Sequence, residues 1–198
     1  MNGETLLALA GLAFSMTWTP GPNNMMLAAS GANFGWRRTM PHAMGVTFGF
    51  PLMLLLVALG LGRVFAAEPR LATILSWVGL AFMLWFAWGI ANAGSARAEQ
   101  RSRPLRFIEA GAFQWVNPKA WAFAILVAAT YATGPSAVEG AMAAALVFLI
   151  SALGSSQAWT IFGAGAGRVL GTGVLLRTFN WAMATLLVAS SIWLVATI

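Results

Sequence analysis

Two short motifs place helix-breaking and polar residues inside apolar stretches of the sequence. The first is Thr19-Pro20-Gly21-Pro22-Asn23-Asn24, and the second is Asn117-Pro118-Lys119. Proline lacks a backbone donor and glycine loosens the chain, so regular helical hydrogen bonding should fail at both motifs. In a membrane the freed backbone groups need protein, water or a bound solute as partners. We therefore expect the two motifs to border a functional site.

The chemistry of the two motifs suits a zwitterionic solute. A helix that begins after Pro118 presents its positive dipole end and free amides, which favour a carboxylate. Carbonyl groups freed before Pro20 can accept hydrogen bonds from an ammonium group, helped by the side chains of Asn23 and Asn24. Asparagine in a broken helix also satisfies local backbone, so both roles stay open. The expected substrate-binding residues are Pro20, Gly21, Pro22, Asn23, Asn24, Gln114, Asn117, Pro118 and Lys119.

Lys119 is a charged residue that the sequence places deep in an apolar stretch. At about 1.5 Å per helical residue, it lies roughly 18 Å into its stretch, and Pro20 lies roughly 22 Å into the first one. A lysine near the bilayer midplane is costly unless it faces a cavity or a partner, which makes it a functional candidate. A substrate carboxylate or bound water is the expected counter-group, and a structural pair or a snorkelling side chain is the alternative.

Other polar residues in apolar surroundings are accessory candidates. Gln157 and Asn180 could border the site, but interhelical hydrogen bonding is the default for such residues. His42 stands next to Pro41 at a helix start, where an interfacial residue is commoner than a proton relay. The glycines between Gly163 and Gly173 predict a flexible helix end.

The same inventory excludes several function classes. The chain has no cysteine and a single histidine, and its five acidic residues are all glutamate. No carboxylate falls deep in an apolar stretch, so neither a metal pathway nor an intramembrane hydrolase is indicated. We expect no catalytic residue, no cofactor and no metal site.

Composition places these motifs in a membrane protein. The 198 residues are 60% hydrophobic and 8% charged, with a mean hydropathy of +0.78, whereas about a quarter of residues are charged in soluble domains. Six apolar stretches approach or exceed the roughly 20 residues that cross a bilayer. They span residues 5–30, 42–62, 71–93, 107–131, 138–162 and 179–198.

The net charge of +6 is best explained by membrane topology. The arginines lie in the gaps between apolar stretches, and no soluble basic domain is present that could bind nucleic acid. With the first, third and fifth gaps in the cytoplasm, eight arginines lie inside and two outside, which predicts that both termini lie on the outer side. The N-terminus has no basic signal-peptide region, so we expect that the first apolar stretch is not cleaved off and remains part of the protein.

The two halves of the chain share a layout. Pro20 is followed 57 residues later by Trp77, and Pro118 is followed 63 residues later by Trp181. Each half also begins with a broken apolar stretch. We expect a single transmembrane domain, with one three-helix repeat in residues 1–93, a cytoplasmic linker in 94–106 and an inverted repeat in 107–198, as in secondary transporters. Chance similarity between apolar stretches is the alternative.

At these motifs the sequence resembles the LysE/RhtB family of amino-acid exporters. The resemblance rests on residues 19–24, on Gly45 to Gly49 and on residues 114–119, and it covers essentially the whole chain. Within the family the chain is most similar to the cysteine/O-acetylserine exporter branch, through Pro22-Asn23-Asn24, residues 75–77 and residues 85–88. The resemblance implies export of amino acids or close derivatives, driven by the proton gradient.

Together these observations predict an all-α polytopic membrane protein with six transmembrane helices, of which the first and fourth are broken. Its expected activity is export of neutral amino acids or derivatives, of the cysteine/O-acetylserine, homoserine or threonine type, across a bacterial cytoplasmic membrane. The expected partners are a small amino-acid substrate and the lipid bilayer, without nucleic acid, and homo-oligomerisation stays open. A transporter or channel for another solute such as a metal cation, and a non-transporting membrane scaffold, are the alternatives.

Overall fold

The computed structural model describes residues 1–62, 67–93 and 103–197, and these residues form helices and connecting turns without any strand. The all-helical prediction is therefore confirmed for the described chain. The first half contains α1 (Gly3–Trp18), α2 (Pro22–Phe34), α3 (Trp36–Leu56), a π-helical turn (Val57–Leu61) and α5 (Pro69–Ala91). The second half contains α6 (Phe107–Phe113), a 3-10 turn (Gln114–Val116), α7 (Pro118–Tyr131), a second 3-10 turn (Gly134–Ser136), α8 (Ala137–Leu170) and α9 (Val174–Thr197).

Both predicted breaks are present. α1 ends at Trp18, and the chain is extended at Thr19 (φ −68°, ψ 146°) before α2 begins at Pro22. In the second half, the 3-10 turn ends at Val116, and Asn117 (φ −87°, ψ 109°) separates it from α7. A proline opens each new helix, at a position where its missing N–H costs nothing.

The described chain contains four uninterrupted segments that are long and apolar enough to cross a membrane. They are Trp36–Leu61, Thr73–Ala91, Gly134–Leu170 and Val174–Ala196. The other two apolar stretches of the sequence are the broken ones, each divided into two shorter helices. Each division falls at a proline-containing motif, where the missing N–H and the ring disturb helical hydrogen bonding, whereas Pro41 and Pro51 are accommodated inside α3.

Several predicted boundaries are wrong by up to one or two turns. The gap expected at residues 31–41 is a corner at Gly35 (φ 79°), so Arg37 and Arg38 belong to the first turn of α3. α8 continues to Leu170, and α9 begins at Val174 rather than near residue 179. Of the predicted linker 94–106, residues 94–102 lie outside the described residues.

The expected flexible helix end at Gly163–Gly173 is only partly right. Gly163 and Gly167 lie inside α8, where an added Cβ would collide with the backbone carbonyls of Ala28 and Ala32. Small residues at this spacing let two helix backbones approach closely. Only Gly171 (φ 62°) and Gly173 (φ 91°), beyond the end of α8, adopt the left-handed conformation. Gly163 and Gly167 are therefore packing residues.

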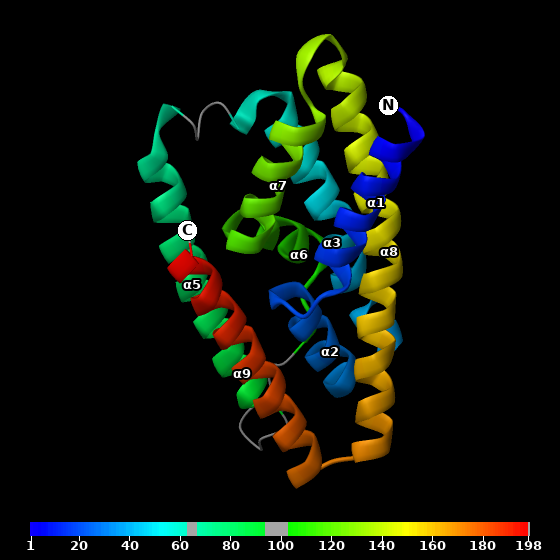
Figure 1. Cartoon of the computed structure of the whole chain (residues 1–198). Coiled ribbons are helices and arrows are strands. Elements are labelled where there is room, and N and C mark those ends of the chain that lie inside the picture. Colours follow the sequence, from blue (N-terminus) through cyan, green and yellow to red (C-terminus); the bar gives the residue numbers. More distant parts are fainter. Residues whose placement is uncertain (63–66, 94–102, 198) are drawn as a thin grey trace.

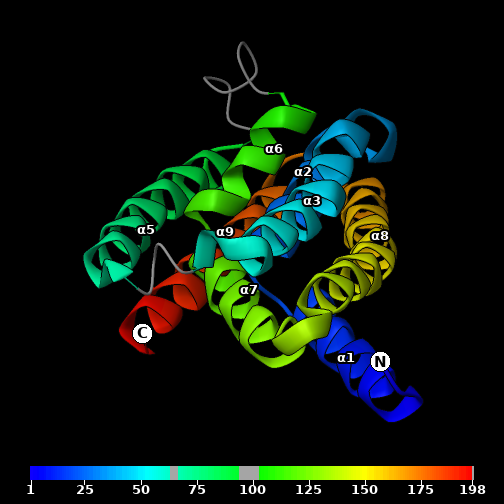
Figure 2. The same cartoon turned by 90° about the horizontal axis from the view of Figure 1, so that it is seen from above.

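α2 occupies the centre of the helix arrangement. It packs extensively on α8 and also contacts α9, α3 and α5, while α5 pairs with α9 on one side of the molecule (Figure 1). Viewed from above, α6 and α7 lie between the α5–α9 pair and the helices α3 and α8 (Figure 2). The two breaks come together inside this arrangement, where residues of both line one cavity.

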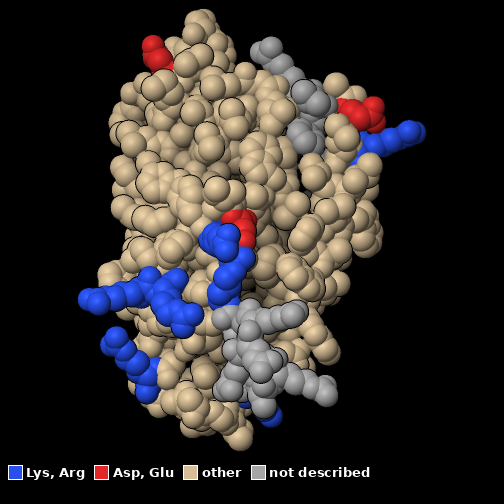
Figure 3. All heavy atoms as spheres, turned by 180° about the vertical axis from the view of Figure 1, so that it is seen from behind, with Lys and Arg blue, Asp and Glu red and all other residues tan. Residues whose placement is uncertain are grey.

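Basic side chains gather in one half of the surface. In Figure 3 most of the blue side chains lie in the lower half of the visible face, and one lies at the upper right. The ion pair found among the described residues joins Arg103 to Glu109 at 2.6 Å.

Candidate substrate site at the two helix breaks

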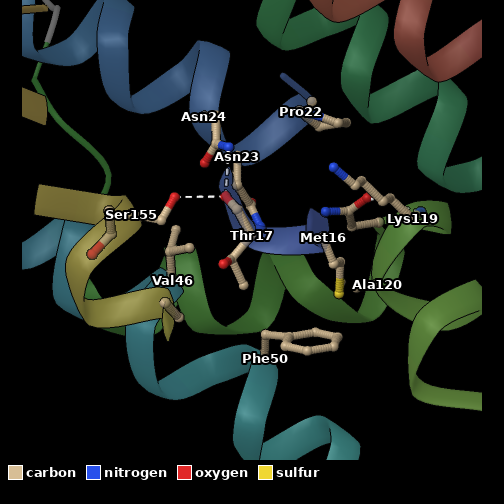
Figure 4. A pocket seen from close by; sticks show the side chains of 14 residues that line it. Met16, Thr17, Pro22, Asn23, Asn24, Val46, Phe50, Lys119, Ala120 and Ser155 are labelled. Carbon is tan, nitrogen blue, oxygen red and sulfur yellow. Dashed lines mark hydrogen bonds between the residues drawn. The ribbon is translucent and has the colours of Figure 1, made fainter. Parts of the chain in front are cut away.

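A cavity of about 50 Å³ lies where the two breaks meet, which is room for a few water molecules. It is bounded by the end of α1, the start of α2, the start of α7 and the middle of α3 and α8 (Figure 4). The lining residues are Met16, Thr17, Gly21, Pro22, Asn23, Asn24, Val46, Phe50, Asn117, Lys119, Ala120, Ala152, Ser155 and Ser156.

Lys119 reaches from α7 to the opposite break. Its Nζ donates a hydrogen bond of 3.1 Å to Thr19 Oγ1. A Cβ added at Gly21 would lie 2.9 Å from this Nζ and 3.2 Å from Lys119 Cδ. Among the described residues, no carboxylate lies within ion-pair distance of Lys119. The ammonium therefore faces the cavity with a neutral hydroxyl as its partner.

The start of α7 provides a second feature that favours anions. Asn117 caps the helix, and its Oδ1 accepts a hydrogen bond of 3.1 Å from the backbone N–H of Lys119. The first backbone amides of a helix lack partners within the helix, and they carry its positive dipole end. Because Lys119 is the second residue of this helix, the dipole and the ammonium act at the same place.

Asn24 satisfies the backbone that the first break exposes. Its Nδ2 donates to the carbonyl oxygens of Thr17 and Thr19, both at 2.8 Å. Ser155 Oγ donates to the same Thr17 carbonyl at 2.5 Å. These carbonyls are the ones expected to receive a substrate ammonium, so the structure favours the local-backbone role for Asn24.

Asn23 and Gln114 form a reciprocal amide pair between α2 and the second broken segment. Asn23 Nδ2 donates to Gln114 Oε1 at 2.9 Å, and Gln114 Nε2 donates to Asn23 Oδ1 at 3.2 Å. Gln114 is fully buried and does not line the cavity, whereas Asn23 does. The pair joins the two halves at the cavity wall.

The structure thus brings six of the nine expected binding residues to one cavity. They are Gly21, Pro22, Asn23, Asn24, Asn117 and Lys119. Pro20 and Pro118 do not line it, and they act as the breaks that shape it. Sequence reasoning missed Thr17, which lines the cavity and whose position within a turn of Pro20 was the available signal. Thr19 was named as part of the first motif but not as a binding residue.

The three accessory candidates lie away from this cavity. Gln157 accepts a hydrogen bond from Trp36 Nε1 at 2.9 Å, which links α3 to α8. Asn180 is buried and exchanges amide hydrogen bonds with Asn33 at 2.8 and 3.0 Å. His42 is 2% exposed rather than interfacial. Gln157 and Asn180 therefore make interhelical contacts, the default expected for them.

The described residues contain no group of three or more His, Cys, Asp or Glu side chains that could hold a metal ion. What the cavity offers is an ammonium, a helix N-terminus, hydroxyl groups and amides, together with the apolar side chains of Met16, Val46 and Phe50. Such a set can bind a small polar solute that carries an anionic group.

A helical chain with four segments long and apolar enough to cross a membrane, and with a polar cavity at two helix breaks, has the features of a membrane transport protein. The chain belongs to the LysE type translocator family, whose model matches residues 14–198.

Curated relatives carry a more specific description. A cysteine/O-acetylserine efflux protein of Klebsiella pneumoniae is 29% identical over 181 residues, which cover 89% of this chain and 90% of the relative. Proteins of the same description from Salmonella choleraesuis and Escherichia coli are 33% and 32% identical over 113 and 114 residues, which cover 57% of this chain and 58% of each relative. No solved structure matches the chain.

Proposed function

We propose that the protein is a secondary active exporter of neutral amino acids or their close derivatives. The observation that carries this proposal is the position of Lys119, whose ammonium lines a cavity between two helix breaks without a carboxylate partner among the described residues. Lys119 is half-buried, and a cation in a membrane-spanning region is costly unless a partner or solute supplies the opposite charge. A substrate carboxylate is the natural counter-group.

The description of the relatives as cysteine/O-acetylserine efflux proteins supports this substrate class. Cysteine and O-acetylserine both carry an α-carboxylate and an α-ammonium group, so they match a site with one cationic wall. A basic amino acid would bring a second positive charge toward Lys119 and would be repelled. We therefore propose small neutral amino acids, including O-acylated ones, as the cargo.

The cavity has room for only a few water molecules in this structure, so it would widen to admit a solute, which would then lie across it. Its carboxylate would contact Lys119 Nζ and the first amides of α7, at the right in Figure 4. Its ammonium would donate to the hydroxyl oxygen of Ser155, which lines the cavity on the other side. The carbonyls of Thr17 and Thr19 are already paired with Asn24, so the hydroxyl replaces them as the proposed acceptor.

Transport would follow alternating access between two inverted halves, each with one broken and two continuous helices. The layout of α1–α2, α3 and α5 in one half and α6–α7, α8 and α9 in the other supports this arrangement. The Asn23–Gln114 pair would close the cavity between the halves. We propose that the basic end faces the cytoplasm and that the proton gradient drives export.

Flux in proteoliposomes tests the proposal. Vesicles loaded with labelled O-acetyl-L-serine should release it faster with the parental protein than with protein-free controls, and an imposed proton gradient should accelerate release. Lys119→Ala and Pro20→Ala/Pro22→Ala variants that insert normally should lose this flux. Parental rates in these variants would refute the site, and absence of flux for every neutral amino acid would refute the function.

A further inference from the structure

A second and larger cavity lies beside α2, toward the basic end of the molecule. It measures about 810 Å³, within the range of roughly 300–1,000 Å³ typical of small-molecule sites. Its walls come from the second half of α2, from α5, from α6 and from residues 103–105. We infer that this cavity, called the vestibule below, is a second binding site that takes the transported amino acid by its apolar or acylated side chain.

One wall of the vestibule is aromatic. It is lined by four residues of α5, namely Phe82, Trp85, Phe86 and Trp88. Phe113 of α6 contacts Phe86 edge-on, with 5.3 Å between the ring centroids. Aromatic rings offer a large apolar contact area. This wall therefore suits an aliphatic or acyl group rather than a charged one.

The polar side of the vestibule has one unpaired nitrogen. His42 lines the cavity and is 2% exposed, and its Nδ1 has no hydrogen-bond partner. Buried polar atoms are almost always paired, so an orphan of this kind calls for an explanation. A ligand that exchanges a hydrogen bond with Nδ1 supplies one.

The remaining hydroxyl, amide and charged side chains of the vestibule are already paired. Ser30 shares a hydrogen bond of 3.0 Å with Thr39, and Asn33 is held by Asn180. Arg103 and Glu109 form a two-pronged ion pair at 2.6 and 2.7 Å. Among the described residues, His42 Nδ1 is thus the buried polar side-chain atom of the vestibule that has no partner.

The vestibule and the central cavity have no lining residue in common. Phe113, which precedes the 3-10 turn of Gln114, and Val116, the last residue of that turn, line the vestibule, while the partner of Gln114, Asn23, lines the central cavity. A solute held in the vestibule is therefore separated from Lys119 by the Asn23–Gln114 pair. This assignment rests on the proposed export function, because the occupant is the exported solute.

The absence of native cysteine allows a direct binding test. Ala112 is an exposed residue of α6 that lines the vestibule, so an Ala112→Cys protein in liposomes should react with a water-soluble thiol reagent. At ten times the dissociation constant of O-acetyl-L-serine, mass action leaves about one site in eleven empty, and labelling should slow about tenfold. A Val174→Cys protein, labelled at an exposed position at the start of α9, should show no such protection.

Variants of His42 in the Ala112→Cys background separate a binding role from a structural one. Asparagine can place a polar atom near the position of Nδ1 and leucine cannot, so protection of the vestibule thiol should persist with His42→Asn and disappear with His42→Leu. Equal protection in both would overturn the role of His42. Protection by oleate but not by the amino acid would overturn the proposal in favour of a lipid site.

Parallel flux measurements distinguish the two proposals. Solute flux without protection of the vestibule thiol would overturn the vestibule site and leave the export function standing. Protection that depends on His42 supports the vestibule even in a protein with no measurable flux. Neither protection nor flux would overturn both.

Discussion

Lys119 Nζ and Thr19 Oγ1 lie 3.1 Å apart, although the two residues are separated by 100 positions in the sequence. Their hydrogen bond joins the break between α1 and α2 to the start of α7. A neutral hydroxyl does not neutralise an ammonium, so this contact orients Lys119 without removing its preference for an anion. Variants at and around this contact are the most informative tests of the site.

Lys119→Met should abolish transport without weakening the fold. A hydrogen bond to a charged group contributes about 1.5–3 kcal/mol, and about 1.4 kcal/mol corresponds to a factor of ten, so flux in proteoliposomes should fall at least tenfold. The melting temperature in detergent should stay equal or rise, because an ammonium without a carboxylate partner leaves apolar surroundings. Arg177→Ala, at an exposed arginine of α9, is the control. If Lys119→Met lowered the melting temperature together with the flux, Lys119 would have a structural role instead.

Gly21→Ala should impair transport through Lys119. The new Cβ would lie 2.9 Å from Nζ, so the flexible lysine side chain must move, while the extended backbone at Gly21 (φ 177°) accepts alanine without strain. We expect weaker solute binding, measured as a smaller rise in melting temperature on addition of O-acetyl-L-serine. Gly165→Ala is the matched control, since a Cβ there meets nothing within 4 Å, and equal ligand-induced shifts in the two variants would contradict the prediction.

The two amide pairs at the ends of α2 should differ in function. Asn23–Gln114 lies at the cavity and Asn33–Asn180 lies toward the basic end, with the same reciprocal geometry. Double-mutant cycles to alanine should give coupling energies of about 0.5–3 kcal/mol in stability for both pairs. Only the Asn23–Gln114 cycle should show coupling in flux, and similar flux coupling at both pairs would argue against a specific gate.

Gly163→Val should destabilise the contact between α2 and α8. The added side chain would strike the carbonyl of Ala28, and forced overpacking of this kind costs about 1–3 kcal/mol. The melting temperature in detergent should fall clearly, and the yield of folded protein should fall with it. Gly165→Val, on the open side of the same helix, should cost much less, so similar losses in both would show that helix propensity rather than packing is responsible.

Local chemistry explains what could be predicted from the sequence. Pro20, Pro22 and Pro118 weaken helical hydrogen bonding through a missing N–H and a ring clash, which are local properties of the chain. A proline alone does not force a break, because Pro41 and Pro51 lie inside α3. The polar cap at Asn117 is local as well, because it pairs with a backbone amide two residues away. Helix ends were less predictable, since apolar periodicity continues from α8 toward α9 and only the left-handed Gly171 and Gly173 mark the turn.

Contacts across the chain could not be predicted in the same way. No local pattern distinguishes Asn24, which satisfies the backbone of α1, from Asn23, which pairs with Gln114. Nor does the sequence reveal that His42 is buried with an unpaired Nδ1. These outcomes depend on which residues of distant helices arrive at the same place.

The sequence by itself determined that this chain is helical, that it suits a membrane, and that it breaks at two motifs, because these properties follow from composition and backbone chemistry. Only the tertiary structure decided that the breaks meet at one cavity, that Lys119 spans it to Thr19, and that a vestibule with His42 lies beyond the Asn23–Gln114 pair. The physical reason is that packing of α2 against α8, α9 and α5 sets these distances, and such packing depends on pairs of residues far apart in the chain.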